Sequence, residues 1–508
     1  MKIIQKISFN TLVIIAYAVL SCCIFAFFMF GYCYHLFHRE QVSLFLLNAE
    51  FIRHYFSGQA CLANLIGDFL TQFYYYIAAG PVIIASVLWL LAIVVRKVAL
   101  HVGLLPKVAA VLGAIAMLWE MMRELYFIYP LSSSIALLIS FGLVLLYPTH
   151  QKTIVRIVCA IAIVMLSMLV AGNAAWLTLF SIVIAEIYCR NVIVLIVSLV
   201  LCLFLPRETS KYTQWISLPN FYLERQFAAD VNYSWHTYKS VAKPDLLPVE
   251  QYYNILSNIT NLDAIVKPSV LRQTSMLPID QTSNYFYITA AGELWFEMGD
   301  MTMAEHATML GMIFSPYHHG TRYLRRLAEI NIIVGDENAA EKYLRMLSQT
   351  IVHKKWAQKR LKNNRTDDYK AYLTHMQTLM PTADSIRYTT DYKRSMRNML
   401  NTNRNNVLAR NYLFLTELKN KDVVSFATDV EQYLPPMQLD ATLAEAYIVA
   451  MAAVDSVERE KFSVRRVSPE IMQRFAEFNK LYLQYDSVTL CKKYSDSYWF
   501  YYKFQSIK

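Results

Sequence analysis

The hydrophobic positions divide the chain into two parts. Up to Pro206, long apolar blocks follow one another with few charges between them, whereas from Arg207 onward apolar residues recur at helical spacing among many charged ones. The first part holds 11 Lys and Arg and 6 Asp and Glu, and the second holds 37 and 32. We therefore predict an all-α protein with a polytopic membrane helix bundle over 1–206, a linker over 207–218 and a soluble helical domain over 219–508.

Seven apolar blocks are candidates for membrane passes. The first, Thr11–Phe30, is long enough to cross a bilayer core of about 30 Å. Val19-Leu20-Ser21-Cys22 loosely resembles a lipoprotein cleavage box, but the apolar run continues past it, so an uncleaved anchor is preferred. The other six blocks are Ala78–Val95, Leu104–Leu118, Leu131–Leu146, Ile154–Val170, Ala174–Tyr188 and Val192–Leu205.

The last apolar stretch, Ala174–Pro206, is interrupted by Arg190 and Asn191. It forms either two short passes or one long kinked helix. An arginine in the middle of a bilayer costs several kcal/mol, so two passes are expected. Glu186 lies four residues before Arg190 and is placed to pair with it on a helix. Seven passes leave the soluble domain outside the cytoplasm, and six leave it inside.

The basic residues of the short loops support seven passes with the N-terminus inside, because inner loops are enriched in Lys and Arg. In that topology the outer side holds only Arg39, Arg53 and Arg123. The inner side holds Lys2, Lys6, Arg96, Lys97, Lys107, Lys152, Arg156 and Arg190.

The first outer loop, residues 37–77, is the longest in the membrane part. Leu44, Leu47, Phe51 and Tyr55 recur in it at helical spacing, which predicts a helix lying along the membrane interface. The aromatic run 73–76 then leads into the second pass, as expected for an aromatic belt.

Carboxylates on the predicted outer face are the candidates for chemistry. Glu120 and Glu124 are four residues apart and would share one face of a helix, where their oxygens suit a divalent cation. Glu40 and Asp68 are the candidate catalytic bases. In the alternative interpretation all four are solvated carboxylates balanced by neighbouring arginines. The predicted outer face contains no closely spaced acidic pair that would favour an enzyme active site over this alternative.

Two sets of basic residues are candidates for binding anions. Arg39 and Arg53 in the first outer loop would contact phosphate if the protein is an enzyme. Six positive charges also lie within twelve residues of the second part: Lys354, Lys355, Lys359, Arg360, Lys362 and Arg365. They indicate a glycan or phospholipid head group as partner, or simply a solvated helix end. Nucleic acid is not expected outside the cytoplasm.

The second part contains an internal repeat. Gly299-Asp300, followed after three residues by Ala304-Glu305, recurs 36 residues later as Gly335-Asp336 followed by Ala340-Glu341. The period is close to the 34 residues of tetratricopeptide repeats, in which each unit is a helical hairpin. Asn420-Lys421-Asp422 is a looser third turn, and 442–456 with 470–485 is a possible fourth pair. The repeat predicts a tetratricopeptide-like helical-repeat domain, with another helical bundle as the alternative.

Cysteines and metal-binding motifs narrow the possible sites. Seven of the eight cysteines lie in the first part, and Cys491 is the exception. The second part therefore cannot form an internal disulfide. No CxxC and no zinc-type spacing is present. A divalent cation is the only cofactor considered, and only for an enzyme.

Three segments carry a resemblance to a family of uncharacterised integral membrane proteins found in Bacteroidetes. They are Asp68–Tyr76, Arg326–Leu344 and Ser497–Tyr502. The resemblance covers most of the chain and implies a Gram-negative inner membrane as the location. It supplies no catalytic residue, because the family has no established activity.

Two functions fit these features. The first is a membrane-anchored periplasmic interaction or scaffold protein of envelope or surface-glycan processes, which binds a protein or peptide on its helical repeats. The alternative is a multi-pass enzyme similar to lipid-linked-sugar glycosyltransferases, with an active site on the outer face. No motif names a reaction, so the sequence leaves open whether the protein is an enzyme. A transporter is disfavoured, because the apolar blocks hold few polar residues and show no inverted repeat.

Overall fold

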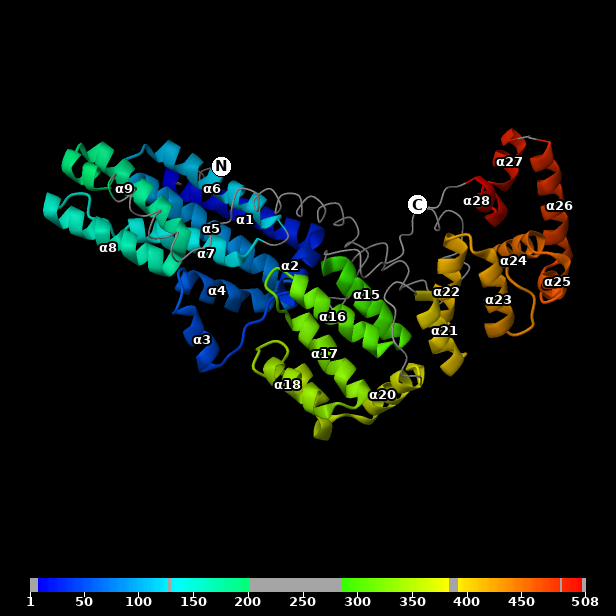
Figure 1. Cartoon of the computed structure of the whole chain (residues 1–508). Helices are drawn as coiled ribbons and strands as arrows, with labels where there is room; N and C mark the ends of the chain where they lie inside the picture. The colour runs from blue at the N-terminus through cyan, green and yellow to red at the C-terminus, as the bar shows by residue number, and fades with distance from the viewer. Residues whose placement is uncertain are drawn as a thin grey trace, which may run out of the picture. The chain divides into compact units, whose positions relative to one another are not determined.

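The computed structural model describes residues 8–126, 129–198, 200, 285–382, 392–484 and 487–504. Every regular element in these ranges is a helix, which confirms the all-α prediction (Figure 1). The chain forms two compact units. Unit 1 comprises Met1–Leu246, Ser315–Arg325 and Glu341–Asn364, and unit 2 comprises Leu247–Phe314, Arg326–Ala340 and Arg365–Lys508. The linker predicted at 207–218 lies outside the described residues.

Unit 1 begins with α1 and continues through a series of packed helices. They are α1 (Phe9–Ala26), the π-helix η1 (Phe27–Gly31), α2 (Cys33–Gln41), α3 (Ala49–Tyr55), α4 (Cys61–Thr71), the 3-10 helix η2 (Gln72–Tyr75), α5 (Ala79–His101), α6 (Pro106–Glu124), α7 (Leu131–Val144), α8 (Thr153–Ala171), η3 (Gly172–Ala174) and α9 (Ala175–Cys189). Its later segments contribute α19 (Lys354–Arg360) and η5 (Lys362–Asn364).

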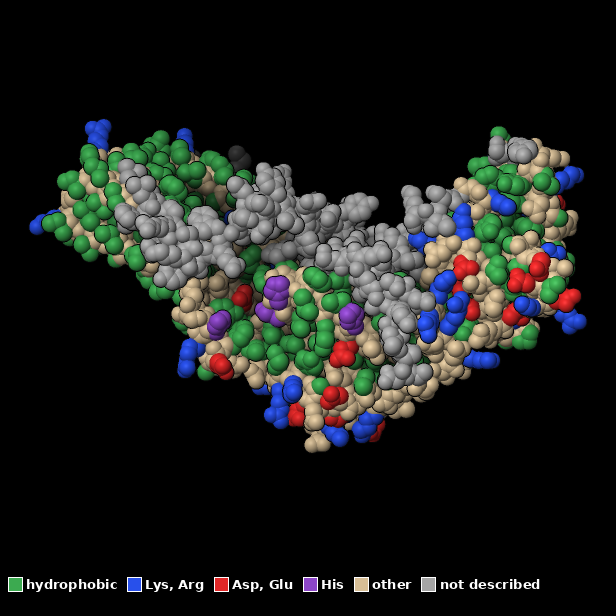
Figure 2. All heavy atoms as spheres, in the orientation of Figure 1, with side chains coloured by type: hydrophobic (Ala, Val, Ile, Leu, Met, Phe, Trp, Pro, Cys, Tyr) green, Lys and Arg blue, Asp and Glu red, His purple; other side chains and the backbone are tan. Residues whose placement is uncertain are grey.

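Among the described residues of unit 1, three stretches are long and apolar enough to cross a membrane: Phe9–Gly31, Ala79–His101 and Thr153–Cys189. The third contains two α-helices, α8 and α9, joined by η3. Large apolar side chains on these helices are exposed, including Leu12, Ile154 and Phe180. Figure 2 shows this surface as mostly hydrophobic with few charges. Such a surface is typical of membrane association.

Small and hydroxyl side chains fill the closest helix crossings in unit 1. A Cβ atom at Gly67 of α4 would lie 2.5 Å from the Cα of Ser132 in α7, so only glycine allows this approach. Ser140, Ser167 and Thr178 link α7, α8 and α9 by hydroxyl contacts of 3.2 and 2.8 Å, and all three are buried. Close packing through small residues, with polar groups hydrogen-bonded between helices, is usual within membranes.

The apolar stretch before residue 206 is broken where the sequence predicts. α9 ends at Cys189, and Arg190 has φ of 53°, which is left-handed. Residues 192–198 form the next helix, and the side chain of Asn191 accepts a hydrogen bond from Val194 N at 3.3 Å. The two helices are therefore separate elements and not one kinked helix.

The predicted ion pair between Glu186 and Arg190 is wrong. The Glu186 carboxylate, fully buried, binds Arg156 of α8 at 2.5 Å and accepts a hydrogen bond from the Tyr147 hydroxyl at 2.5 Å. Arg190 instead ends α9 in the left-handed conformation, while the buried Arg156 supplies the charge that compensates Glu186.

Unit 2 is built mainly of helices joined by short turns. They are α15 (Tyr285–Met298), α16 (Met301–Phe314), α20 (Asp367–Leu379), α21 (Tyr392–Thr402), α22 (Val407–Lys419), α23 (Val423–Tyr433), α24 (Ala441–Ala453), α25 (Ser456–Arg459), η6 (Val464–Arg466), α26 (Pro469–Leu483), α27 (Ser487–Tyr494) and α28 (Tyr498–Phe504). Two further helices, α17 (Thr321–Val334) and α18 (Glu337–Ser348), each have residues in both units.

The turns of the predicted repeat share one geometry. Gly299 and Gly335 both have φ of 93°. In each case the next residue, Asp300 or Asp336, immediately precedes a helix and accepts a hydrogen bond from a backbone N–H three residues on, at 3.2 and 2.9 Å. The sequence correctly predicts these two turns, because glycine tolerates the left-handed conformation and aspartate caps the helix.

The looser third turn uses a different residue for the same purpose. Lys421 has φ of 59° in place of glycine, and Asp422 accepts a hydrogen bond from Ser425 N at 3.3 Å. The Lys421 ammonium donates to the Tyr502 carbonyl at 2.8 Å, a contact that fixes the turn against α28. The fourth predicted pair corresponds to α24 and α26, which pack together.

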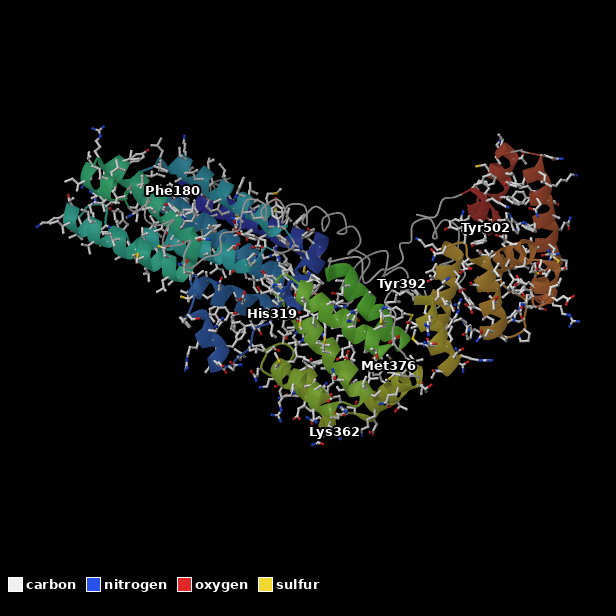
Figure 3. The ribbon with its side chains drawn as sticks, viewed as in Figure 1. Phe180, His319, Lys362, Met376, Tyr392 and Tyr502 are labelled. Carbon is white, nitrogen blue, oxygen red and sulfur yellow. The ribbon has the colours of Figure 1, made fainter. Side chains whose placement is uncertain are left out.

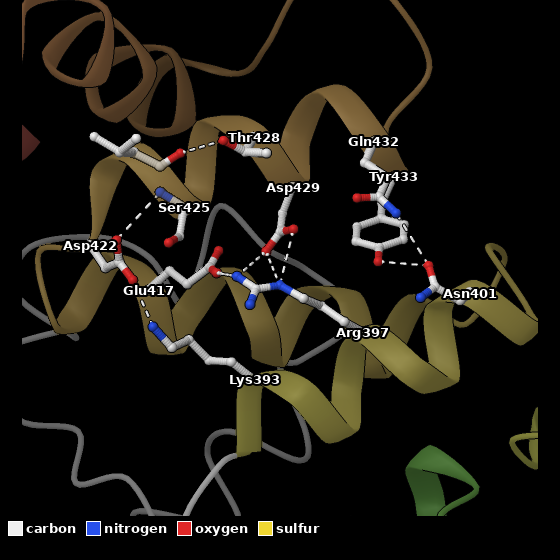
Figure 4. A network of polar contacts seen from close by, with 11 residues as sticks. Lys393, Arg397, Asn401, Glu417, Asp422, Ser425, Thr428, Asp429, Gln432 and Tyr433 are labelled. Carbon is white, nitrogen blue, oxygen red and sulfur yellow. Dashed lines mark hydrogen bonds and ion pairs between the residues drawn. The ribbon is translucent and has the colours of Figure 1, made fainter. Parts of the chain in front are cut away.

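A buried ionic cluster joins α21, α22 and α23 (Figure 4). Arg397 of α21 donates to Asp429 of α23 at 2.9 Å and to Glu417 of α22 at 2.8 Å. Burial raises the pKa of Glu417, and the charge of the neighbouring Asp429 raises it further, while the Arg397 guanidinium acts in the opposite direction. The cluster fixes the register of three helices.

The two repeat glycines provide a matched stability test. We expect Gly335→Ala to lower the free energy of unfolding by about 1 kcal/mol, because alanine is strained at a left-handed φ and nothing else lies within 4 Å of the added Cβ. Gly299→Ala should cost about 2 kcal/mol, since its Cβ would also lie 2.5 Å from the Leu379 Cβ. Thermal unfolding of the full chain in detergent would measure both. Equal effects would contradict the packing described at Gly299.

Candidate functional site

A pocket of about 80 Å³ lies within unit 1. Its wall combines residues of α2, α3, α4 and the start of α7 with the later segment 315–325. The polar lining residues are Arg39, Ser43, Tyr55, Asp68, Thr71, Tyr317 and His319, and the apolar ones are Leu44, Phe51, Pro130 and Leu131. We call it the charged pocket, because an arginine and an aspartate share its wall.

Arg39 lies in the last turn of α2 and is buried in the wall of the charged pocket. Its guanidinium contacts the Glu124 carboxylate at 2.5 Å and donates to the carbonyls of Glu124 and Tyr126 at 2.9 and 2.8 Å. Burial alone would lower the pKa of Arg39, but the Glu124 carboxylate raises it, so the guanidinium remains charged. Among the described residues its Nε atom is buried and has no hydrogen-bond partner.

Asp68 of α4 is the carboxylate that lines the charged pocket. It accepts a hydrogen bond from the Tyr55 hydroxyl of α3 at 2.8 Å. Burial raises the pKa of Asp68, and the Tyr55 hydrogen bond partly offsets this effect. A carboxylate with a raised pKa that faces a cavity is suited to accept a proton.

Two aromatic residues of the segment 315–325 complete the wall. The rings of Tyr317 and His319 are stacked, with centroids 6.0 Å apart and planes at 17°. Burial raises the pKa of Tyr317 to about 12, so that its hydroxyl is a hydrogen-bond donor at neutral pH. Burial also lowers the pKa of His319, so its imidazole is neutral. The sequence offers only one signal for this segment, the pair His318-His319 between Pro316 and Gly320, which is typical of a turn.

Glu120 and Glu124, the candidate cation ligands, lie side by side and are fully buried. Ser134 Oγ lies 2.8 Å from Glu120 Oε1 and 2.7 Å from Glu124 Oε1, and the Tyr129 hydroxyl lies 2.5 Å from Glu120. The Ser134 hydroxyl therefore bridges the two carboxyl groups.

The surroundings of this carboxyl pair do not suit a divalent cation. Glu124 is engaged by the guanidinium of Arg39, whose positive charge opposes a second cation. In the described part of the chain no group of three or more His, Cys, Asp or Glu residues is arranged to hold a metal ion. The pair therefore serves to hold Arg39 in the wall of the charged pocket.

Glu40, the other candidate base, does not line the charged pocket. Its carboxylate contacts His353 Nε2 at 2.7 Å and the Thr321 hydroxyl at 3.0 Å, and all three side chains are buried. These contacts attach both later segments of unit 1 to α2. The arrangement gives Glu40 a positioning role for the segment that carries Tyr317 and His319.

The remaining candidate anion-binding residues lie away from the charged pocket. Arg53 of α3 is exposed, as are Lys354, Lys355 and Lys359 of α19. Arg360 stacks on the Trp356 ring at 4.0 Å. Of the predicted site residues, the structure thus brings Arg39 and Asp68 into one pocket, with Glu120 and Glu124 behind Arg39.

The fold and the charged pocket define an all-helical protein with helices apolar enough to cross a membrane and a polar site built from its first loop. The chain belongs to DUF6057, described as a family of unknown function, which it matches over residues 6–257 and 268–505. No curated protein and no solved structure matches it.

Proposed function

We propose that this chain is a multi-pass membrane transferase, similar in architecture to lipid-linked-sugar glycosyltransferases, with the charged pocket as its active site. The observation that carries the proposal is the position of Asp68: a half-buried carboxylate with a raised pKa that faces a cavity beside Arg39 and Tyr317. The first outer loop, which supplies most of this wall, lies next to helices apolar enough to cross a membrane.

In this mechanism Asp68 acts as the general base. Its carboxylate takes the proton from an acceptor hydroxyl, and the acceptor oxygen forms a bond to the anomeric carbon of the sugar. The bond between that carbon and the oxygen of the lipid phosphate breaks, and its electron pair leaves with the phosphate. The positive charge of Arg39 and the donor hydroxyl of Tyr317 face the pocket in which the phosphate charge develops.

For location we propose the inner membrane of a Gram-negative bacterium of the Bacteroidetes, with seven passes and a periplasmic C-terminal part. The support is the charge distribution of the loops and the helix break at Arg190. A phosphatase fused after Lys508 should be active, and a fluorescent protein that folds only in the cytoplasm should be dark there. The reverse pattern would contradict seven passes.

Asp68→Asn tests the catalytic role of this carboxylate. We expect transfer to fall about 100-fold or more, because asparagine cannot accept the proton. Its amide oxygen still accepts the Tyr55 hydrogen bond, so the local structure should be kept. The measurement is the ratio of lipid-linked sugar to product in membrane extracts, by mass spectrometry, from a deletion strain that expresses each variant. Glu50→Gln, at an exposed position of α3, is the matched control. Normal transfer by Asp68→Asn at equal protein level would remove Asp68 as the base.

A second candidate is the membrane-anchored scaffold, in which unit 2 binds a protein or peptide through tetratricopeptide-like hairpins. The recurrence of one turn geometry at Gly299, Gly335 and Lys421 favours it. Affinity purification of the full chain from cross-linked membranes should then recover a partner of envelope or surface-glycan processes. Its recovery should fall with Gly299→Ala and remain with Asp68→Asn, and the opposite dependence would favour the transferase.

A further inference from the structure

A strongly basic surface lies on α19 and the turn that follows it. Lys354, Lys355, Lys359 and Lys362 are exposed, and Lys362 is labelled in Figure 3. No acidic residue occurs between His353 and Thr366 in the sequence. Within the described residues, these four lysines form no ion pair, whereas the nearby Arg345 pairs with Glu341 on α18. We call these four lysines, with the Trp356 that lies among them, the basic surface.

Trp356 lies within the basic surface between two arginines. The guanidinium carbons of Arg325 and Arg360 are 4.7 and 4.0 Å from the centroid of its ring. The ring itself is only partly buried. An amphipathic indole flanked by cations is the combination that proteins use at the level of lipid head groups.

The start of α19 is fixed beside the point where the chain enters α5. His353, the residue before α19, contacts Glu40 of α2 at 2.7 Å, and its ring lies 5.3 Å from the ring of Tyr75 in η2. Ile351 N donates to the Gln72 side chain of η2 at 3.3 Å. α5, which is long and apolar enough to cross a membrane, begins at Ala79, four residues after Tyr75.

The residues between η2 and α5 expose apolar and aromatic side chains at this level. Tyr76 is 51% exposed and Ile77 is 56% exposed, although the helices on either side are well packed. Aromatic residues at the end of an apolar helix mark the interface of a bilayer. The basic surface is therefore held beside an interfacial segment and not on a remote part of the chain.

We propose that the basic surface binds the anionic phospholipid head groups of the same bilayer that holds α5. The charge, the exposed lysine ammonium groups and the flanked indole match phosphate-bearing head groups. Lipid is favoured over a soluble polyanion because the contacts of His353 and Ile351 keep α19 at the entry of α5. The proposal holds whether or not the charged pocket is catalytic.

The test uses the full chain in neutral detergent, with phosphatidylglycerol and phosphatidylcholine as probes and native mass spectrometry as the measurement. The wild-type chain should prefer phosphatidylglycerol, and the preference should fall as salt rises. Each lysine near a membrane surface changes affinity about fivefold, so replacing all four by glutamine should weaken phosphatidylglycerol binding about 600-fold. The variant Lys359→Gln/Lys362→Gln, which lacks two of the four lysines, should bind phosphatidylglycerol about 25-fold more weakly than the wild-type chain.

The matched control removes four lysines from exposed positions of unit 2. They are Lys461, Lys480, Lys492 and Lys503. This variant has the same net charge as the first and should keep the wild-type preference. A loss of preference in the control equal to that in the α19 variant would overturn the proposal, as would an unchanged preference in the α19 variant. A sulfated oligosaccharide that binds the wild-type chain and is not displaced by phosphatidylglycerol would show that the surface recognises a soluble glycan, which would also overturn it.

Discussion

Arg39→Ala should destabilise the protein by about 3–5 kcal/mol, the largest effect that we expect from a single change in unit 1. The substitution removes an ion pair of 2.5 Å and two hydrogen bonds to carbonyl oxygens. It leaves the Glu124 carboxylate fully buried without its countercharge. Breaking a buried pair by removing one partner is costly because the remaining charge has lost both water and partner.

The melting temperature of the detergent-solubilised chain should fall by roughly 5–15 °C in Arg39→Ala. Arg53→Ala is the control, because it removes the same side chain from an exposed position of the same loop, and it should change the melting temperature little. Arg39→Ala combined with Glu124→Gln should recover part of the loss, since the glutamine amide is neutral. A double variant as unstable as Arg39→Ala would show that the cost comes from lost packing and not from the uncompensated charge.

Glu445→Gln should make unit 2 more stable at pH 8 and leave it nearly unchanged at pH 5. Burial raises the pKa of Glu445 from 4.5 to about 7, although a hydrogen bond from Tyr498 N at 2.7 Å and the charge of Arg474 act in the opposite direction. The folded protein therefore holds a proton that the unfolded chain releases at lower pH. The contribution to stability is complete below about pH 4.5, is lost as the pH rises to about 7, and amounts to about 3 kcal/mol.

The measurement is the melting temperature of wild type and variant between pH 4.5 and pH 8, followed by intrinsic fluorescence. The buried Trp499 lies next to Tyr498, whose N–H donates to Glu445, and is a suitable local reporter. The glutamine oxygen still accepts the Tyr498 hydrogen bond, so the variant should lose the pH dependence and keep the contact. Glu477→Gln changes an exposed carboxylate and should not stabilise the protein at pH 8. An identical pH dependence in wild type and Glu445→Gln would contradict this origin.

The sequence predicts those structural elements that are determined by residues close together in the chain. Apolar blocks predict the long helices, Arg190 and Asn191 predict the break after α9, and Gly-Asp pairs predict the turns at 299 and 335. Each depends on the properties of a few neighbouring residues: burial of apolar area, left-handed φ and helix capping. The expectation of an ion pair between Glu186 and Arg190 failed because Arg156, some 30 residues away along the chain, reaches the same carboxylate.

The candidate site could be predicted only in part. The sequence indicates four charged residues beside apolar blocks, and the structure places them in or behind one pocket: Arg39, Asp68, Glu120 and Glu124. No local pattern indicates that Tyr317 and His319 face Asp68, because this depends on contacts across more than 200 residues of sequence. The prediction of Glu40 as a catalytic base has the same weakness. Its partner, His353, lies far along the chain in the part predicted to be soluble, so no local pattern indicates their contact.

The contact between Glu40 and His353 spans 313 residues, and this sets an order of events during synthesis. At about 5–20 residues per second, the ribosome adds His353 roughly half a minute after Glu40 has been made. For most of that interval the first loop has neither its buried imidazole nor the segment 315–325 that carries Tyr317. The charged pocket of a nascent chain therefore remains incomplete until these segments are synthesised. A product truncated before residue 315 would lack Tyr317 and His319 and could not complete the pocket.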